Sequence, residues 1–116
     1  MSDKRYISDF PNSNLKNDEF PKMYDNMEVE KLTEVLAKNP YLINKSNEAN
    51  GTTLLSRAVY RNNLNITKLL LEKRSNPNLQ NMYGETALHQ AVENLNHKII
   101  NLLLENKANP NIQQKV

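Results

Sequence analysis

The sequence of 116 residues contains no cysteine, and glycine occurs at only two positions. Without cysteine the chain can form no disulfide bond and offers no thiolate ligand to zinc, which leaves its redox compartment open. The longest unbroken aliphatic run is three leucines, far shorter than the roughly 20 apolar residues of a membrane-spanning helix. Because the chain does not open on a basic and apolar leader, we expect no secretion, no membrane partner and a cytoplasmic location.

An excess of charge of one sign is also missing. Fifteen Lys and Arg residues stand against thirteen Asp and Glu residues, which gives a net charge of +2 without a basic cluster. Surfaces that bind nucleic acid concentrate Lys and Arg in one patch, so we expect no nucleic-acid partner. The sequence also lacks a glycine-rich phosphate loop, a nucleophile elbow and a cluster of metal-ligating residues. We therefore expect no cofactor and no metal site.

What the sequence does contain is an internal repeat with a period of 33 residues. Residues 51–80 and 84–113 are identical at 15 of 30 positions, without a gap. In each copy, apolar residues recur at offsets of three and four, which predicts a short helix, a reversal and a longer helix. An Asn-Pro-Asn sequence closes each copy and is expected to stop the second helix. Helices this short cannot bury an apolar face alone, so the copies are expected to stack.

These residues resemble the ankyrin repeat. The pattern of that family is D-x-x-G-x-T-P-L-H-x-A-A, a reversal that contains glycine, and a V-V-x-L-L-L helix followed by G-A-D-x-N. The segments EANGTTLLSRAV and NMYGETALHQAV match the first part, and NITKLLLEKRSNPN and KIINLLLENKANPN match the second. The resemblance covers residues 47–113. It implies an all-α solenoid of stacked helix-turn-helix units, joined by β-turns and extended loops.

The repeat also predicts the domain boundaries. The polar and non-periodic residues 1–17 are expected to form a flexible or extended arm. Residues 18–116 are expected to form one domain, divided into a degenerate repeat (18–46) and two full repeats (47–80 and 81–113). In the degenerate repeat, Pro21 is expected to open a short first helix at its first helical position. The sequence MEVEKLTEVLAKNPYLIN then resembles a second helix with its return.

Departures from the family pattern predict details of the helix ends. Leucine and alanine replace the proline that usually opens the first helix, but Thr53 and Thr86 can still cap it, worth ~1 kcal/mol each. At the end of the second helix, Arg74 and Lys107 replace a glycine in the left-handed conformation. A side chain in that conformation costs roughly 1 kcal/mol.

The two histidines are the candidates for catalysis. His89 stands four residues before Glu93, so that a carboxylate could orient it as a general base. It also occupies the position of the family's structural histidine, which typically bonds the neighbouring loop. Ser56 fills the same position one repeat earlier, and His97 lies at the start of a second helix. We therefore expect a structural His89 and a chain that is not an enzyme.

The resemblance implies that the chain binds another protein through a concave surface of turn tips and first helices. A dedicated inhibitor or antidote of one enzyme or toxin is one form of this function. A structural segment of a larger repeat scaffold is the alternative. Tyr, Met and Arg are enriched in such interfaces. The predicted partner-binding residues are Ala49, Asn50, Thr52, Arg57, Tyr60, Arg61, Met82, Tyr83, Glu85, Gln90, Glu93 and Asn94.

The last repeat lacks the polar outer face that terminal repeats normally carry. The N-terminal helix has charged residues among its apolar ones, whereas HKIINLLLEN is as apolar as the helix one repeat before it. We expect either that further repeats follow or that something covers this face. End-to-end self-association through the C-terminal repeat is one way to cover it.

Overall fold

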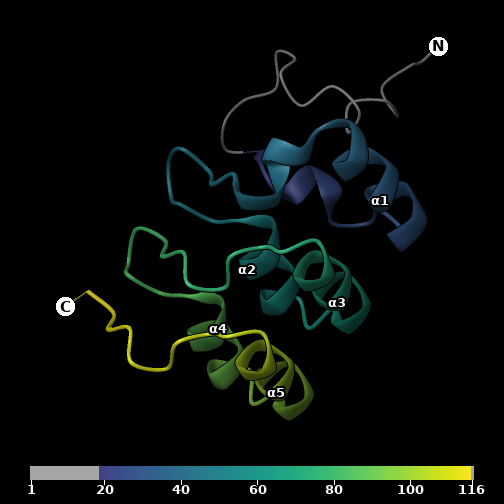
Figure 1. Ribbon diagram of the computed structural model, residues 1–116. Coiled ribbons are helices and arrows are strands. Elements are labelled where there is room, and N and C mark those ends of the chain that lie inside the picture. The colour runs from purple at the N-terminus through teal and green to yellow at the C-terminus, as the bar shows by residue number, and fades with distance from the viewer. Residues whose placement is uncertain (1–18, 116) are drawn as a thin grey trace.

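The computed structural model describes residues 19–115, and the predicted arm at residues 1–17 lies outside the described residues. Three layers follow one another in chain order down the stack (Figure 1). The N-terminal unit contains η3 (Lys22–Tyr24), α1 (Val29–Lys38) and η4 (Pro40–Asn44); the middle unit contains α2 (Leu54–Tyr60) and α3 (Leu64–Glu72); the C-terminal unit contains α4 (Ala87–Glu93) and α5 (His97–Glu105). The described residues form no strand beyond one isolated bridge, so the all-α prediction is confirmed.

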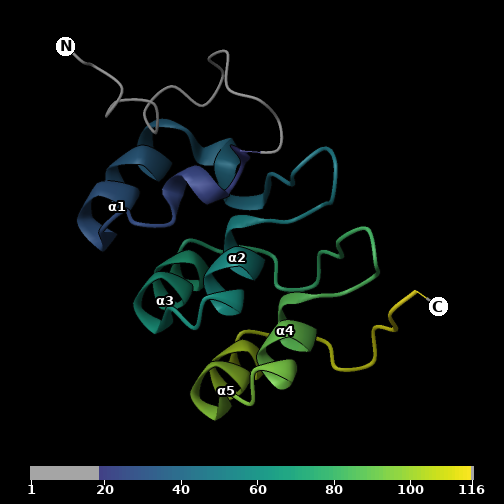
Figure 2. The same cartoon turned by 180° about the vertical axis from the view of Figure 1, so that it is seen from behind.

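The units stack helix on helix. Helix α2 packs against α4, while α3 packs against α1 on one side and α5 on the other. The two views in Figures 1 and 2 show α2 above α4 in one column and α3 above α5 in a second column, with the loops projecting from the first. The side chains between the layers are fully buried and mostly aliphatic: Leu32, Val35, Leu42, Leu55, Val59, Leu70, Ile99 and Leu103.

The helices begin where the sequence predicts, except in the N-terminal unit. The hydroxyls of Thr53 and Thr86 accept the backbone N–H groups of Ser56 and His89, so both threonines are caps, as predicted. Pro21, in contrast, precedes η3 as its capping residue, and the prediction that it occupies the first helical position is wrong. The chain after α1 also differs, because the return of this unit is the short helix η4.

Four helices end without glycine. Arg74 and Lys107 have φ angles of 70° and 73°, as expected, and Asn62 and Leu95 adopt 59° and 55° at the reversals. After α3, Ser75 N–H donates to Leu70 and Arg74 N–H to Leu71, which is the Schellman arrangement. Helices α3 and α5 therefore end at Glu72 and Glu105, just before these left-handed residues and ahead of the Asn-Pro-Asn sequences that were expected to stop them.

Glycine is kept where the loops of successive units stack. Gly51 and Gly84 have φ angles of 81° and 78°. A Cβ atom on Gly51 would lie 2.9 Å from the Cα atom of Asn81, so the next loop leaves no room for a side chain. The same loops are joined by a hydrogen bond of 2.8 Å from the N–H of Met82 to the carbonyl of Asn50.

The left-handed helix ends generate a stability prediction. We expect Arg74→Gly, Lys107→Gly and Leu95→Gly each to stabilise the fold by roughly 1 kcal/mol, since glycine adopts a positive φ without steric cost. Thermal unfolding should show melting temperatures that rise by about 4–8 °C. Asn62→Gly is the control: its side-chain oxygen accepts a hydrogen bond from Asn96, so its melting temperature should not rise. Unchanged or lower values for the first three variants would contradict the prediction.

Candidate functional site

The twelve predicted partner-binding residues lie in the turn loops, in α2 and α4, and at the caps of these helices. They differ in exposure. Seven are exposed to solvent: Ala49, Asn50, Tyr60, Arg61, Met82, Tyr83 and Glu93. Five are partly buried: Thr52, Arg57, Glu85, Gln90 and Asn94.

A groove brings five of the predicted residues together. It has a volume of about 210 Å³ and is lined by Asn50, Thr52, Arg57, Tyr60 and Gln90, together with Phe20, Pro21, Lys22, Ser56 and Asn81. The groove thus spans the start of the N-terminal unit, helix α2 and the edge of the C-terminal unit. Its lining includes two cationic side chains and no carboxylate, so it favours an acidic or hydrogen-bonding ligand over a cationic one.

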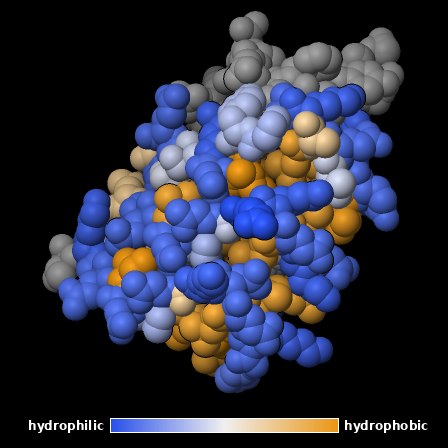
Figure 3. Space-filling view, in the orientation of Figure 1, coloured by the Kyte–Doolittle hydropathy of each residue, from blue (hydrophilic) through white to orange (hydrophobic). Residues whose placement is uncertain are grey.

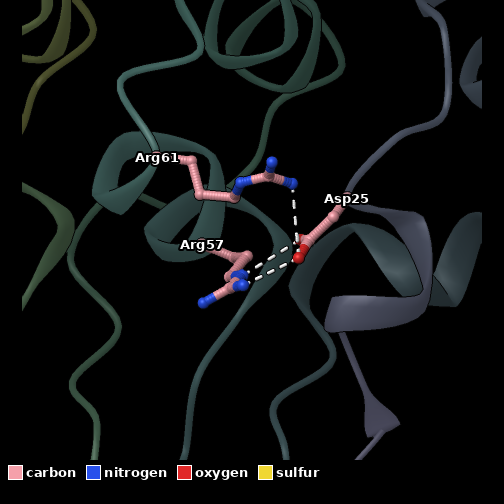
Figure 4. A network of polar contacts seen from close by, with 3 residues as sticks. All are labelled: Asp25, Arg57 and Arg61. Atoms are coloured by element: carbon pink, nitrogen blue, oxygen red, sulfur yellow. Dashed lines mark hydrogen bonds and ion pairs between the residues drawn. The ribbon is translucent and has the colours of Figure 1, made fainter.

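A bidentate ion pair fixes one wall of the groove (Figure 4). The Nε and Nη2 atoms of Arg57 donate to the two carboxylate oxygens of Asp25 at 3.0 and 2.7 Å. Arg61 reaches the same carboxylate from one helical turn further on, at 3.3 Å. Arg57 and Asp25 are partly buried, with side chains 24% and 17% exposed, whereas Arg61 is exposed. The contact connects the N-terminal unit to α2 and holds both arginines in place.

The charges of this cluster leave a positive excess. Burial by itself would raise the pKa of the Asp25 carboxyl, but the hydrogen bonds and charges of Arg57 and Arg61 outweigh it and lower that pKa. One carboxylate therefore stands between two guanidinium groups at neutral pH. The surplus positive charge lies beside the groove, where Lys22 adds another.

Tyr60 is the exposed aromatic side chain of the groove, whereas Phe20 in the same lining is buried. The guanidinium carbon of Arg57 lies 5.5 Å from its ring centroid, within cation–π range. Tyr60 nevertheless remains accessible, since 58% of the residue is exposed. Asp25 therefore fixes Arg57, and Arg57 in turn supports the ring against which a partner could pack.

The turn loop of the C-terminal unit presents two further apolar side chains. Met82 and Tyr83 are 50% and 60% exposed at its tip. Behind them, the carboxylate of Glu85 accepts hydrogen bonds from the amides of Asn81 and Gln90. The loop tip is therefore apolar and supported by a network in which Glu85 and Gln90 bind each other.

Two of the predicted partner-binding residues, Glu93 and Asn94, make contacts outside the groove. The side-chain amide of Asn94 donates to the backbone carbonyls of Val59 and Tyr60, which joins the end of α4 to the end of α2. Glu93 lies outside the groove and borders a second depression on the outer side of α4, together with Leu88 and Val92. Neither residue lines the groove around Tyr60.

His89 has a structural contact. Its Nδ1 atom accepts the backbone N–H of Thr86 at 2.8 Å and so completes the capping box of α4. This bond joins two residues at the start of α4. At the start of α2, Ser56 accepts the backbone N–H of Thr53 in the same way. Across residues 19–115 no group of three metal-ligating side chains is present, and none of the helices there is long and apolar enough to cross a membrane.

Sequence reasoning missed the contribution of the N-terminal unit. Phe20, Pro21 and Lys22 line the groove, but this unit was expected only to complete the stack. A signal for Asp25 was available, because Arg57 and Arg61 are like charges at i and i+4 on one helix and repel each other unless an acid lies between them. The loop around Asn47 is also one residue longer than its counterpart: Asn47 and Thr52 pair across it, whereas Asn81 pairs with Glu85.

Comparison with known proteins agrees with this architecture. A family model described as ankyrin repeats (3 copies) matches residues 24–114. The match begins inside the N-terminal unit, so it covers most of that unit as well as the two units that follow it. No curated protein matches the chain.

The ion pair predicts a pH-dependent contribution to stability. A carboxyl with a lowered pKa in the folded state stabilises the fold above its ordinary value of 3.8 and loses this effect as the pH falls through the folded value. We expect Asp25→Asn to cost about 2 kcal/mol at pH 7, typical of lost charged hydrogen bonds. Denaturant unfolding from pH 7 to pH 2.5 should show this cost shrinking below pH 3.8. Glu72→Gln, at an exposed site, should cost little at any pH, and a pH-independent cost for Asp25→Asn would contradict the prediction.

Proposed function

The chain belongs to the ankyrin-repeat family, and from this premise we propose that it is a non-catalytic module that binds one partner protein through its groove and turn tips. Ankyrin repeats generally mediate protein–protein interaction. The observation that carries the proposal is the groove around Tyr60, where a half-exposed aromatic ring stands between fixed cationic groups and side-chain amides. Aromatic and Arg side chains in such a setting are the usual anchors of protein interfaces.

The rigidity of the site supports the same function. Arg57 is held by two hydrogen bonds to Asp25, and Glu85 is held by Asn81 and Gln90. Side chains that are already fixed lose little conformational entropy when a partner binds, so more of the contact energy appears as affinity. The apolar tip at Met82 and Tyr83 extends the surface beyond the groove.

A dedicated inhibitor or antidote is the more specific form of this proposal. A module without catalytic groups acts on its partner by occupying it, which suits the blocking of one enzyme or toxin. The alternative is a structural segment of a larger repeat scaffold, and the apolar side chains exposed on the outer side of α4 and α5 favour it. Affinity purification from the native source with mass spectrometry separates the two: a single stoichiometric partner whose activity falls on binding supports the inhibitor.

Substitutions on the groove and the loop tip test the binding surface. We expect Tyr60→Ala, Arg61→Ala and Tyr83→Ala each to weaken the partner complex, at least one of them by ~2 kcal/mol or more, because exposed Tyr and Arg are typical hot spots. Isothermal titration with the purified partner measures the change. Arg61→Ala should also lower the melting temperature slightly, since Arg61 contacts Asp25.

Lys73→Ala is the matched control for these variants. Lys73 is exposed at the end of α3, on the helix column away from the loops, and its removal should leave affinity unchanged (Figure 2). Wild-type affinity in all three groove variants would place the binding surface elsewhere on the molecule.

A further inference from the structure

The groove around Tyr60 has room for one or two side chains of a partner rather than for a whole small molecule. Its volume is about 210 Å³, whereas pockets that hold small molecules usually measure roughly 300–1,000 Å³. Two lining residues, Phe20 and Pro21, are buried, while Lys22 and Tyr60 are exposed. The polar groups of the lining therefore decide which side chain the groove accepts.

The carboxylates next to the groove already have partners. Both oxygens of Asp25 accept hydrogen bonds from Arg57. Glu85 accepts from two side-chain amides on its Oε1 atom and from the amide of Gln114 on its Oε2 atom. Neither acid lines the groove. The cationic groups of the lining are thus left without a carboxylate of their own inside it.

The polar groups of the lining that remain unbonded are mostly donors. Arg57 uses its Nε and Nη2 atoms on Asp25, which leaves Nη1. The ammonium group of Lys22 has no hydrogen bond or ion pair in the part of the chain that the structure describes. The side-chain oxygen of Asn50 accepts a backbone N–H of its own loop, so its amide NH₂ group is left to donate. An excess of donors, two of them cationic, favours a ligand with an anionic acceptor.

The two ends of the groove differ in charge. Lys22 belongs to the N-terminal unit and Arg57 to α2, whereas Gln90 on α4 forms the other end. The NH₂ group of Gln90 donates to Glu85, which leaves its side-chain oxygen as an acceptor beside that carboxylate. An anion near Gln90 would be repelled by Glu85, so the anionic group of a ligand belongs at the end formed by Lys22 and Arg57.

Tyr60 adds an apolar contact at the cationic end. Its ring lies 5.5 Å from the guanidinium carbon of Arg57, and the residue is exposed. The loop side of the molecule, at the left in Figure 3, is mostly hydrophilic, with scattered hydrophobic residues. A wholly apolar segment does not suit this surface. A segment with one acid beside one large apolar residue does, because each side chain then meets its complement.

We propose that the groove recognises an extended segment of the partner protein that carries a Glu or Asp side chain beside a large apolar residue. This inference rests on the proposed binding function of the groove. The carboxylate accepts hydrogen bonds from Nζ of Lys22 and Nη1 of Arg57, and the apolar residue packs on Tyr60. Asn50 and Gln90 bond the backbone of the segment, which is free to pair only when the segment is extended.

A phosphorylated side chain matches the same groove less well. A phosphoryl group carries a charge of about −1.5 to −2 at neutral pH and is held best by guanidinium groups that offer two parallel N–H bonds. Arg57 already gives two parallel bonds to Asp25, so only its Nη1 group remains. A carboxylate, with a single charge, is the better match to this remaining group and to Lys22.

Selection from a displayed library of random linear peptides on the folded 116-residue chain tests the recognition. Peptides that bind the wild type but not Tyr60→Ala are those that occupy the groove. We expect them to share one Glu or Asp beside a large apolar residue. Replacement of that acid by its amide should weaken binding by about tenfold or more, as for a lost hydrogen bond to a charged group. The affinity of the acidic peptide should also fall as salt is added.

Lys22→Glu reverses the charge at one end of the groove. Lys22 is exposed, so the variant should keep the wild-type circular dichroism spectrum. The same library selected on this variant should lose the preference for an acid beside the apolar residue. Lys73→Glu is the matched control, since Lys73 is also an exposed lysine but lies at the end of α3 and does not line the groove. It should select the same peptides as the wild type.

The outcomes separate this inference from the function on which it rests. Peptides that depend on Tyr60 but share no acid would overturn the acidic recognition and leave the binding groove intact. An unchanged selection on Lys22→Glu would do the same, as would tighter binding when phosphoserine replaces the shared acid. If no selected peptide depends on Tyr60, both the inference and the proposed function of the groove fail.

Discussion

Contact between successive helix pairs is the interaction on which the rest of this structure depends. Helices of seven and nine residues are too short to persist alone in water, and each acquires its stability from the layer beside it. Val59 is fully buried under the next helix pair, whereas its counterpart Val92, which no helix pair covers among the described residues, is 52% exposed. The loops obey the same constraint, since glycine is retained at position 51 where the neighbouring loop approaches within 2.9 Å of a would-be Cβ atom.

Stacking also creates the candidate site. No single unit contains the groove: the N-terminal unit supplies Lys22, helix α2 supplies Tyr60, and the C-terminal unit supplies Gln90. The Asp25 carboxylate then locks the first of these units to the second through Arg57. A binding surface made in this way is as rigid as the stack itself, which suits the proposed role of holding a partner protein.

The sequence was sufficient to predict the features that repeat. The period of 33 residues predicted the stack, and the repeated turn-and-helix pattern predicted the threonine caps. The left-handed Arg74 followed from the resemblance to the ankyrin pattern, which has glycine at that position. The contacts that occur once could not be predicted in this way. Asp25, which bonds Arg57, lies in a unit that has lost most of the repeat pattern. The loop after Asn47 has one residue more than its counterpart after Asn81, which the repeat also could not predict.

Amide hydrogen exchange tests most directly whether stacking is the source of stability. At a concentration where the chain is monomeric, α3 is covered on both sides and α5 on one, so amides of α3 should exchange more slowly than the equivalent amides of α5. The pair Leu70 and Leu103 is the sharpest comparison, because both are leucines with fully buried side chains at the same place in the repeat. Slower exchange at Leu70 than at Leu103 is the predicted result. Equal protection at the two positions, or greater protection at Leu103, would contradict the account.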